Sequence, residues 1–179
     1  EAAGGRLIDA WMAFGEYDLS KNKLDYKEIN SPFNRDCEKN WSMFYHKDEL
    51  KIIYEWSPLT IGKIVDNKLN IEKKIEMPPI FKIFRGTTNA CLYKDELWFL
   101  CHVVENSQPR HYYHVFVVLD SKTLEYKKHS KIFNIDGDKI EYCLGLVVEE
   151  KRIIISHSNW DRTSKLKVFN KERICKYIF

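Results

Sequence analysis

Polar side chains interrupt the apolar stretches of this sequence at widely separated places. Asn40 and Arg85 each precede a group of apolar stretches, His102 directly follows the apolar run 97–101, and Asp161 follows another apolar group. Amide and carboxylate groups form hydrogen bonds with sugar hydroxyls, and a guanidinium offers a planar fork of donors. These residue types therefore suit the binding of a polar ligand such as a carbohydrate.

Each of these residues also has a structural interpretation. Arg85, which Gly86 follows, could form a bulge and pair with a neighbouring carboxylate. His102 extends an apolar strand and could be a hydrogen-bonded core histidine, and Asp161 could cap a turn with Asn159. Three tryptophans could stack on sugar rings, although most such aromatic residues pack in cores: Trp41, Trp56 and Trp160.

Candidate acids and bases are scattered along the chain. A glycosidase normally needs two carboxylates that flank the scissile bond, and no motif here pairs any two of Glu55, Glu105, Glu141 and Asp161. His111 and His114 would point to opposite faces of a strand, which disfavours a shared metal. The sequence therefore predicts neither a metal nor a cofactor, and it leaves enzymatic activity open.

An internal repeat in the sequence predicts the elements that position these residues. Residues 45–54 are echoed by residues 92–101 and more faintly by residues 147–156, each as an apolar run, a charged turn and a second apolar run. This pattern is typical of a β-hairpin. A second turn-like landmark recurs at 18–21, 66–69, 120–123 and 170–173. Both landmarks recur at intervals of about 50 residues, close to the period of propeller blades.

The repeat and the strand-like runs predict an all-β fold, specifically a β-propeller of the five-bladed type. We expect residues 1–179 to form one partial domain of about three blades, with units at roughly 10–66, 67–120 and 121–170 and incomplete ends. Closed propellers usually have about 4–8 blades, and an open arc leaves strand edges unpaired. The remaining blades are therefore expected from a longer chain or from another subunit.

Composition restricts the partners. The 179 residues contain 29 basic and 26 acidic side chains without a basic stripe, which argues against nucleic acid. No apolar run approaches the length of about 20 residues that a membrane span needs. The five cysteines show no CxxC spacing, which favours reduced core cysteines and a reducing compartment such as the cytoplasm.

The polar positions also occur in an order that resembles glycoside hydrolase family 130, a family of five-bladed β-propellers that phosphorolyse or hydrolyse β-mannosides. The sequence has Lys-Asn, Arg-Gly, a strand ending in His, Tyr-x-x-x-x-x-Leu-Asp, Ile-Glu-Tyr-x-x-Gly-Leu and a strand ending in Asp, spread over roughly residues 39–168. Propellers attached to glycosyltransferases look similar. The resemblance implies a sugar-binding axial pocket that contains Asn40, Arg85, His102, Tyr113 and Asp161.

Two departures from this family bear on activity. The blade that carries the family's catalytic Asp has no counterpart in the sequence, and Tyr54-Glu55 stands where the phosphorylases have His-Arg. A carboxylate repels a phosphate dianion, so phosphorolysis is disfavoured.

Three functions remain open. The first is a glycan-binding propeller, accessory to a glycosyltransferase or derived from a glycosidase. The second is a protein–protein interaction scaffold, because fold alone does not give function. The third is a β-mannoside hydrolase or phosphorylase whose catalytic acid lies in further upstream sequence.

Overall fold

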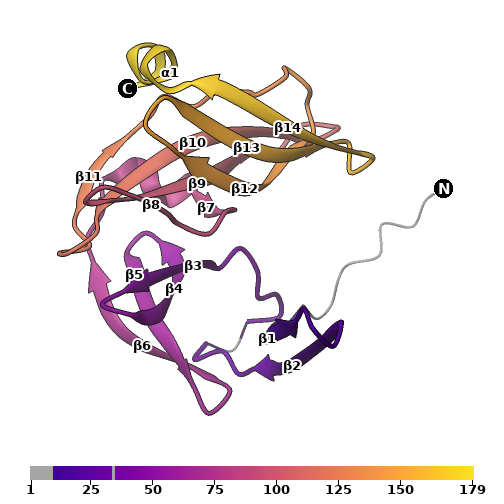
Figure 1. Ribbon diagram of the computed structural model, residues 1–179, viewed down its shortest axis with the longest axis vertical. Coiled ribbons are helices and arrows are strands. Elements are labelled where there is room, and N and C mark those ends of the chain that lie inside the picture. The colour runs from indigo at the N-terminus through magenta and orange to yellow at the C-terminus, as the bar shows by residue number, and fades with distance from the viewer. Residues whose placement is uncertain (1–9, 34) are drawn as a thin grey trace.

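The computed structural model describes residues 10–33 and 35–179, which lie mostly in β-strands (Figure 1). The first sheet pairs β1 (Met12–Asp18) with β2 (Lys23–Ile29). The second sheet has the order β3 (Ser42–His46), β4 (Glu49–Trp56), β5 (Leu59–Val65) and β6 (Lys68–Ile75). The all-β prediction is confirmed for most of the described chain.

The third sheet has the order β11-β10-β9-β7, and β8 also pairs with β9. Its strands are β7 (Arg85–Gly86), β8 (Cys91–Tyr93), β9 (Glu96–Glu105), β10 (His111–Asp120) and β11 (Tyr126–His129), preceded by the 3-10 helix η1 (Pro79–Ile83). The fourth sheet has the order β12 (Glu141–Val148), β13 (Arg152–Asn159) and β14 (Thr163–Asn170), followed by the helix α1 (Lys171–Ile178). Every strand pair within the four sheets is antiparallel.

The three repeated hairpins predicted from the sequence are confirmed. They connect β3 to β4, β8 to β9 and β12 to β13, which are antiparallel pairs in three different sheets. Lys47 and Asp48 both take positive φ in the first of these turns, as the two central residues of a type I′ hairpin turn do. Asp66 and Asn67 do the same between β5 and β6.

Neighbouring sheets pack face to face, and each pair shares an apolar core. The core between the first and second sheets includes Ile29, Ile52, Leu69 and the partly buried Phe14. The core between the second and third sheets includes Phe44, Ile53, Ile61, Phe99, Val115 and Val117, together with Phe81 of η1. The core between the third and fourth sheets includes Trp98, Leu100, Phe116, Val118, Cys143, Ile153 and Ile155.

The central strands β9 and β10 are buried on both faces. In β9, Leu97 and Phe99 face the second sheet, whereas Trp98 and Leu100 face the fourth. Side chains alternate between the faces of a strand, so a strand that packs on both sides must be apolar throughout. This requirement explains why residues 97–101 of β9 and 115–119 of β10 are all apolar.

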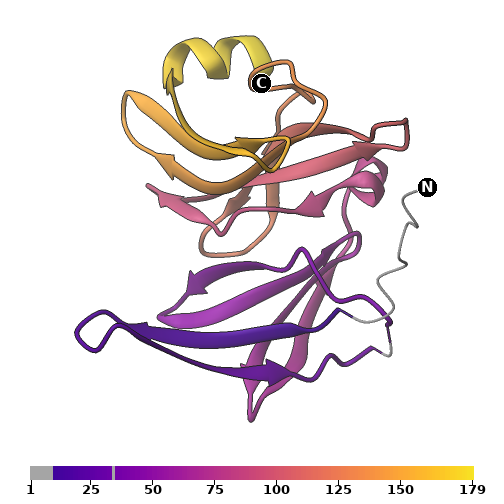
Figure 2. The same ribbon diagram turned by 90° about the vertical axis from the view of Figure 1, so that its right-hand side faces the viewer.

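The four sheets follow one another in a curved row, with the fourth sheet at one end and the first at the other (Figures 1 and 2). Within residues 10–33 and 35–179 the row does not close into a ring. The description of the fold as a propeller therefore stays a prediction.

The helix α1 differs from the strand-only expectation. Its N-terminus is capped by Asn170, whose side chain accepts a hydrogen bond from the backbone N–H of Arg173 at 2.8 Å. Ile174, Cys175 and Ile178 pack against the core of the fourth sheet. Eight residues give little more than two turns, too few for a sustained apolar stripe in the sequence. In the described parts of the chain, no helix combines the length and the apolar character that a membrane crossing requires.

Candidate functional site

A cleft of about 350 Å³ lies between the second and third sheets. Three segments line it: the loop before β3, the end of β4, and the start of β7. The lining residues are Arg35, Cys37, Lys39, Asn40, Tyr54, Glu55, Trp56, Phe84, Arg85 and Gly86. Asn40 and Arg85, two of the five residues proposed from the sequence, thus line the same cavity although they are 45 positions apart in the chain.

A close backbone approach joins the two walls of this cleft. Asn40 takes a positive φ of 64°, a conformation that asparagine tolerates better than most residues. A Cβ added to the buried Gly86 would collide with the carbonyl oxygen of Asn40. It would also lie only 2.6 Å from Oγ of Ser42. Gly86 therefore allows the strand that carries Arg85 to approach the segment that carries Asn40.

We expect Gly86→Ala to lower the free energy of unfolding by about 1–3 kcal/mol, because an added methyl group meets backbone atoms that cannot move independently. The walls of the cleft should separate as well. Chemical denaturation of Gly86→Ala beside Gly137→Ala measures the first effect. Gly137 is an informative control because a Cβ there meets nothing, although its φ of +86° still strains alanine. An unfolding free energy for Gly86→Ala equal to that of the wild type would contradict the close approach.

The charged groups of the cleft are unequal in number. Arg35, Lys39 and Arg85 face a single acidic lining residue, Glu55. The carboxylate of Glu55 accepts a hydrogen bond from the Arg35 guanidinium at 3.1 Å. Arg35 is held further by Tyr54, whose ring centroid lies 5.0 Å from its guanidinium carbon. The repulsion that Glu55 was expected to exert on an anion is therefore offset by an adjacent cation.

A buried carboxylate supports the cleft from behind. Glu38 is buried and accepts hydrogen bonds from the hydroxyl of Tyr54 at 3.0 Å and from Nε1 of Trp41 at 3.3 Å. Burial, against a lowering by Ser31 and with the hydrogen bond to Glu38, raises the pKa of Tyr54 to about 12. Tyr54 is therefore neutral near pH 7 and keeps its hydroxyl proton directed at Glu38.

The three tryptophans differ in their surroundings. Trp56 is buried and packs edge-on against Phe99 with ring centroids 5.2 Å apart, whereas Trp160 is exposed outside this cleft. Trp41 is held by Glu38. Among the described residues the indole N–H of Trp56 has no hydrogen-bond acceptor, and Trp56 lines the cleft. A buried donor without a partner is costly, and protein atoms cover this nitrogen, so it is not available to a ligand in the cleft.

His102 lies beside the cleft but does not line it. It is directly opposite Arg85 in the β7–β9 pairing, and its Nδ1 lies 2.6 Å from Thr87 Oγ1. The side chain is buried between Tyr112 and Tyr142. Burial, with a smaller contribution from the positive charge of Arg85, lowers the pKa of His102 to about 4. His102 is thus a neutral, hydrogen-bonded residue behind Arg85, which agrees with its structural interpretation.

Tyr113 and Asp161 lie outside the lining of this cleft. Tyr113 donates a hydrogen bond to Glu105 at 3.0 Å and stacks on His111 at a centroid distance of 4.2 Å. Asp161 is exposed in the turn between β13 and β14 and takes a positive φ of 53°. The structure therefore brings Asn40 and Arg85 together and places His102 next to them, while the two other residues belong to different surroundings.

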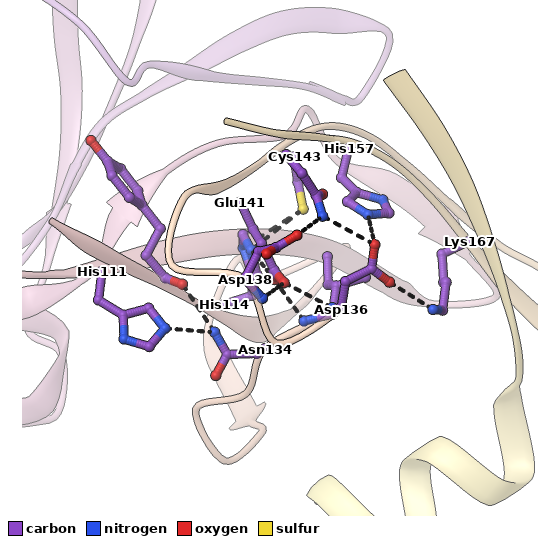
Figure 3. A network of polar contacts seen from close by, with 12 residues as sticks. His111, His114, Asn134, Asp136, Asp138, Glu141, Cys143, His157 and Lys167 are labelled. Atoms are coloured by element: carbon purple, nitrogen blue, oxygen red, sulfur yellow. Dashed lines mark hydrogen bonds and ion pairs between the residues drawn. The ribbon is translucent and has the colours of Figure 1, made fainter. Parts of the chain in front are cut away.

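A second polar cluster lies at the fourth sheet (Figure 3). Glu141 is fully buried, and its carboxylate accepts hydrogen bonds from the backbone N–H groups of Ile135, Asp136 and Asp138 at 2.7, 2.8 and 2.9 Å. His114 Nε2 lies 3.6 Å from the same carboxylate. Although burial by itself raises it, these contacts lower the pKa of Glu141 to about 2. Glu141 therefore anchors the loop 135–138 as a carboxylate.

The thiol of Cys143 lies next to His114, at 3.6 Å from its Nδ1, and Figure 3 shows Cys143, His114 and Glu141 together. A cysteine, a histidine and a carboxylate can form a nucleophilic site when the thiol loses its proton. Here all three side chains are fully buried, and burial raises the pKa of Cys143 well above its usual range. The arrangement is therefore a packed core contact without a reactive thiolate.

The neighbouring Asp136 joins this cluster to β14. Its carboxylate contacts Nζ of Lys165 at 2.8 Å, Nζ of Lys167 at 2.7 Å and Nε2 of His157 at 3.1 Å. The two lysines, then His157, hold the pKa of Asp136 far below its usual range. In residues 10–33 and 35–179, no three His, Cys, Asp or Glu side chains are arranged to hold a metal ion. This cluster therefore ties a loop to a strand.

Comparisons with protein-family models, with curated proteins and with solved structures give no match to this chain.

Proposed function

We propose that the cleft between the second and third sheets binds a carbohydrate, and that the chain is part of a β-propeller that is accessory to a glycosyltransferase or derived from a glycosidase. The observation that carries the proposal is the presence of Asn40, Arg85 and Lys39 in the lining of one cavity, beside Tyr54 and Trp56. The sequence resemblance to glycoside hydrolase family 130 adds independent support, because it selects Asn40 and Arg85 from the residues alone.

The chemistry of the cleft fits a ligand with many hydroxyl groups. Asn40 can both donate and accept hydrogen bonds, whereas Arg85 and Lys39 donate them. Tyr54 and Trp56 supply apolar surface at the end of β4, which suits the carbon-bound faces of a sugar ring. A volume of about 350 Å³ falls in the lower part of the range of small-ligand sites.

Binding without cleavage is the better supported form of this function. Glycoside hydrolysis normally requires two carboxylates, or one acid together with phosphate or water. The only carboxylate that lines the cleft within the described residues is Glu55, and it is engaged by Arg35. No second acid is in position to act on a bound sugar there.

The test is a glycan array followed by calorimetric titration of the oligosaccharide with the strongest signal, with β-mannosides in the panel. Arg85→Ala and Asn40→Gly are expected to weaken binding about tenfold or more each, because each removes hydrogen bonds to the ligand. Glycine at position 40 is preferable to alanine, since the positive φ of Asn40 costs glycine nothing.

Arg110→Ala is the matched control, because Arg110 is an exposed arginine that lies outside the lining of the cleft. Its affinity should equal that of the wild type. Equal affinities for Arg85→Ala and Arg110→Ala would place the sugar elsewhere on the protein. An array without any binding would favour the scaffold function instead.

A further inference from the structure

Two basic residues meet in the cleft between the second and third sheets. Lys39 and Arg85 both line it, and the carbonyl oxygen of Asn40 lies against Gly86. Since Lys39 directly precedes the first of these contact residues and Arg85 the second, the contact holds the two basic residues close together. Both are exposed, so their charged groups are accessible to a ligand in the cleft.

Neither of these basic residues is neutralised by a partner in the described chain. Within residues 10–33 and 35–179 the cleft contains one ion pair, between Arg35 and Glu55 at 3.1 Å, and neither Lys39 nor Arg85 takes part in another. The carboxylate of Glu38 is buried behind the cleft, where it accepts hydrogen bonds from two aromatic side chains instead. Two cationic groups of the cleft are therefore left with free donors.

The charges in and behind the cleft leave one positive charge without a counter-charge. Three basic side chains line it, whereas Glu55 is the acidic residue of the described lining. Glu38 also counts, because its carboxylate lies 3.0 Å from the hydroxyl of Tyr54 in the cleft wall. An anion with a single negative charge would complete this balance. A dianion would exceed it and would be repelled by Glu55.

The neighbouring His102 supplies no counter-charge. It is buried and lies opposite Arg85 in the β7–β9 pairing. Burial is the first cause of its low pKa of about 4, and the positive charges of Arg85 and Lys39 lower this pKa further. The positive potential of the two basic residues therefore extends behind the cleft, and the neutral histidine leaves it uncompensated.

We propose that the ligand of this cleft is an acidic sugar, a hexuronate whose carboxylate lies between Arg85 and Lys39. This inference rests on the carbohydrate-binding function proposed above and specifies the class of sugar. The guanidinium of Arg85 can bind a carboxylate through two parallel N–H groups, and the ammonium of Lys39 can add a third charge-assisted hydrogen bond. Asn40, next to Lys39 in the same wall, remains free to bond a ring hydroxyl group.

The test compares sugars that share one ring and differ only at C6: a neutral hexose, its hexuronate and its 6-phosphate, each in the gluco, galacto and manno configurations. Calorimetric titration should give an affinity for a hexuronate about tenfold or more above that for the matching hexose. The 6-phosphate should bind more weakly than the hexuronate, because its dianion is repelled by Glu55. Salt at about 1 M should remove most of the preference for the hexuronate, since it shortens the Debye length to about 3 Å.

Two charge variants test where the carboxylate binds. Lys39→Gln keeps a polar side chain without its charge and should lower the ratio of hexuronate to hexose affinity about tenfold. Glu55→Gln removes the repelling carboxylate and should raise this ratio severalfold. Lys176→Gln is the matched control, because Lys176 is an exposed lysine of α1 outside the cleft and its loss changes the net charge equally. Its ratio should equal that of the wild type, and circular dichroism checks that each variant is folded.

Three results would overturn this inference and leave the carbohydrate function standing. Equal affinities for a hexose and its hexuronate would show a cleft that does not select an acid. A ratio that Lys39→Gln and Lys176→Gln lower equally would trace the preference to the net charge of the protein. A 6-phosphate that binds more tightly than the hexuronate would assign the cleft to a phosphorylated sugar. If no sugar of any charge binds, the carbohydrate function itself is wrong and this inference falls with it.

Discussion

Replacement of Glu141 by glutamine is expected to lower the free energy of unfolding by about 3 kcal/mol at pH 7, because a buried acceptor of several hydrogen bonds loses one of its oxygens. Oε1 of Glu141 accepts from the N–H groups of Asp136 and Asp138, and Oε2 accepts from that of Ile135. The amide NH₂ of glutamine must replace one oxygen and would then face a donor. At least one buried N–H group is left without an acceptor.

Chemical denaturation measures this effect, and Glu149→Gln is its control. Glu149 forms an exposed ion pair with Arg152, and exposed pairs contribute about 0–1 kcal/mol. The wild type should also lose stability in acid. The pKa of Glu141 is lowered from 4.5 to about 2, so its stabilisation is present above pH 4.5 and is lost as the pH falls through 2. An unfolding free energy for Glu141→Gln equal to that of Glu149→Gln would show that the carboxylate does not anchor the loop.

A second large loss of unfolding free energy, in milder acid, is expected from the titration of His102. Its pKa falls from 6.5 to about 4 in the folded chain, so between these pH values the unfolded chain binds a proton that the folded chain does not. The unfolding free energy therefore falls as the pH is lowered from about 6.5 to about 4. The loss from this residue amounts to roughly 3 kcal/mol, at about 1.4 kcal/mol for each pH unit.

Two measurements check this expectation. Denaturation at several pH values should show that His102→Gln loses less stability than the wild type between pH 6.5 and 4, since glutamine has no proton to gain. An NMR titration should find the ring of His102 neutral at pH 5.5. Identical pH profiles for the two proteins, or a ring that titrates near 6.5, would contradict the buried environment of His102.

Some features of the site could be inferred from the sequence, and others could not. Asn40 and Arg85 interrupt recognisable strand patterns, which is why the sequence alone singles both out. Arg35 was missed because it lies in a loop without periodicity, and its contact with Glu55 joins residues 20 positions apart. Tyr113 was grouped with the cleft by resemblance. Its hydrogen bond to Glu105 and its stacking on His111 follow from side-chain direction, which the order of motifs does not specify.

The sequence by itself determined the class of the fold and the positions of its principal hairpins. Alternating apolar residues and turn residues act over a few positions, and they are repeated here in three sheets. Only the tertiary structure decided which residues share a cavity and which are buried. Gly86 allows two distant segments to meet at Asn40, and burial under neighbouring strands lowers the pKa of His102 and raises that of Cys143. These properties depend on the packing of whole sheets against one another, and packing joins residues whose separation in the chain carries no local pattern.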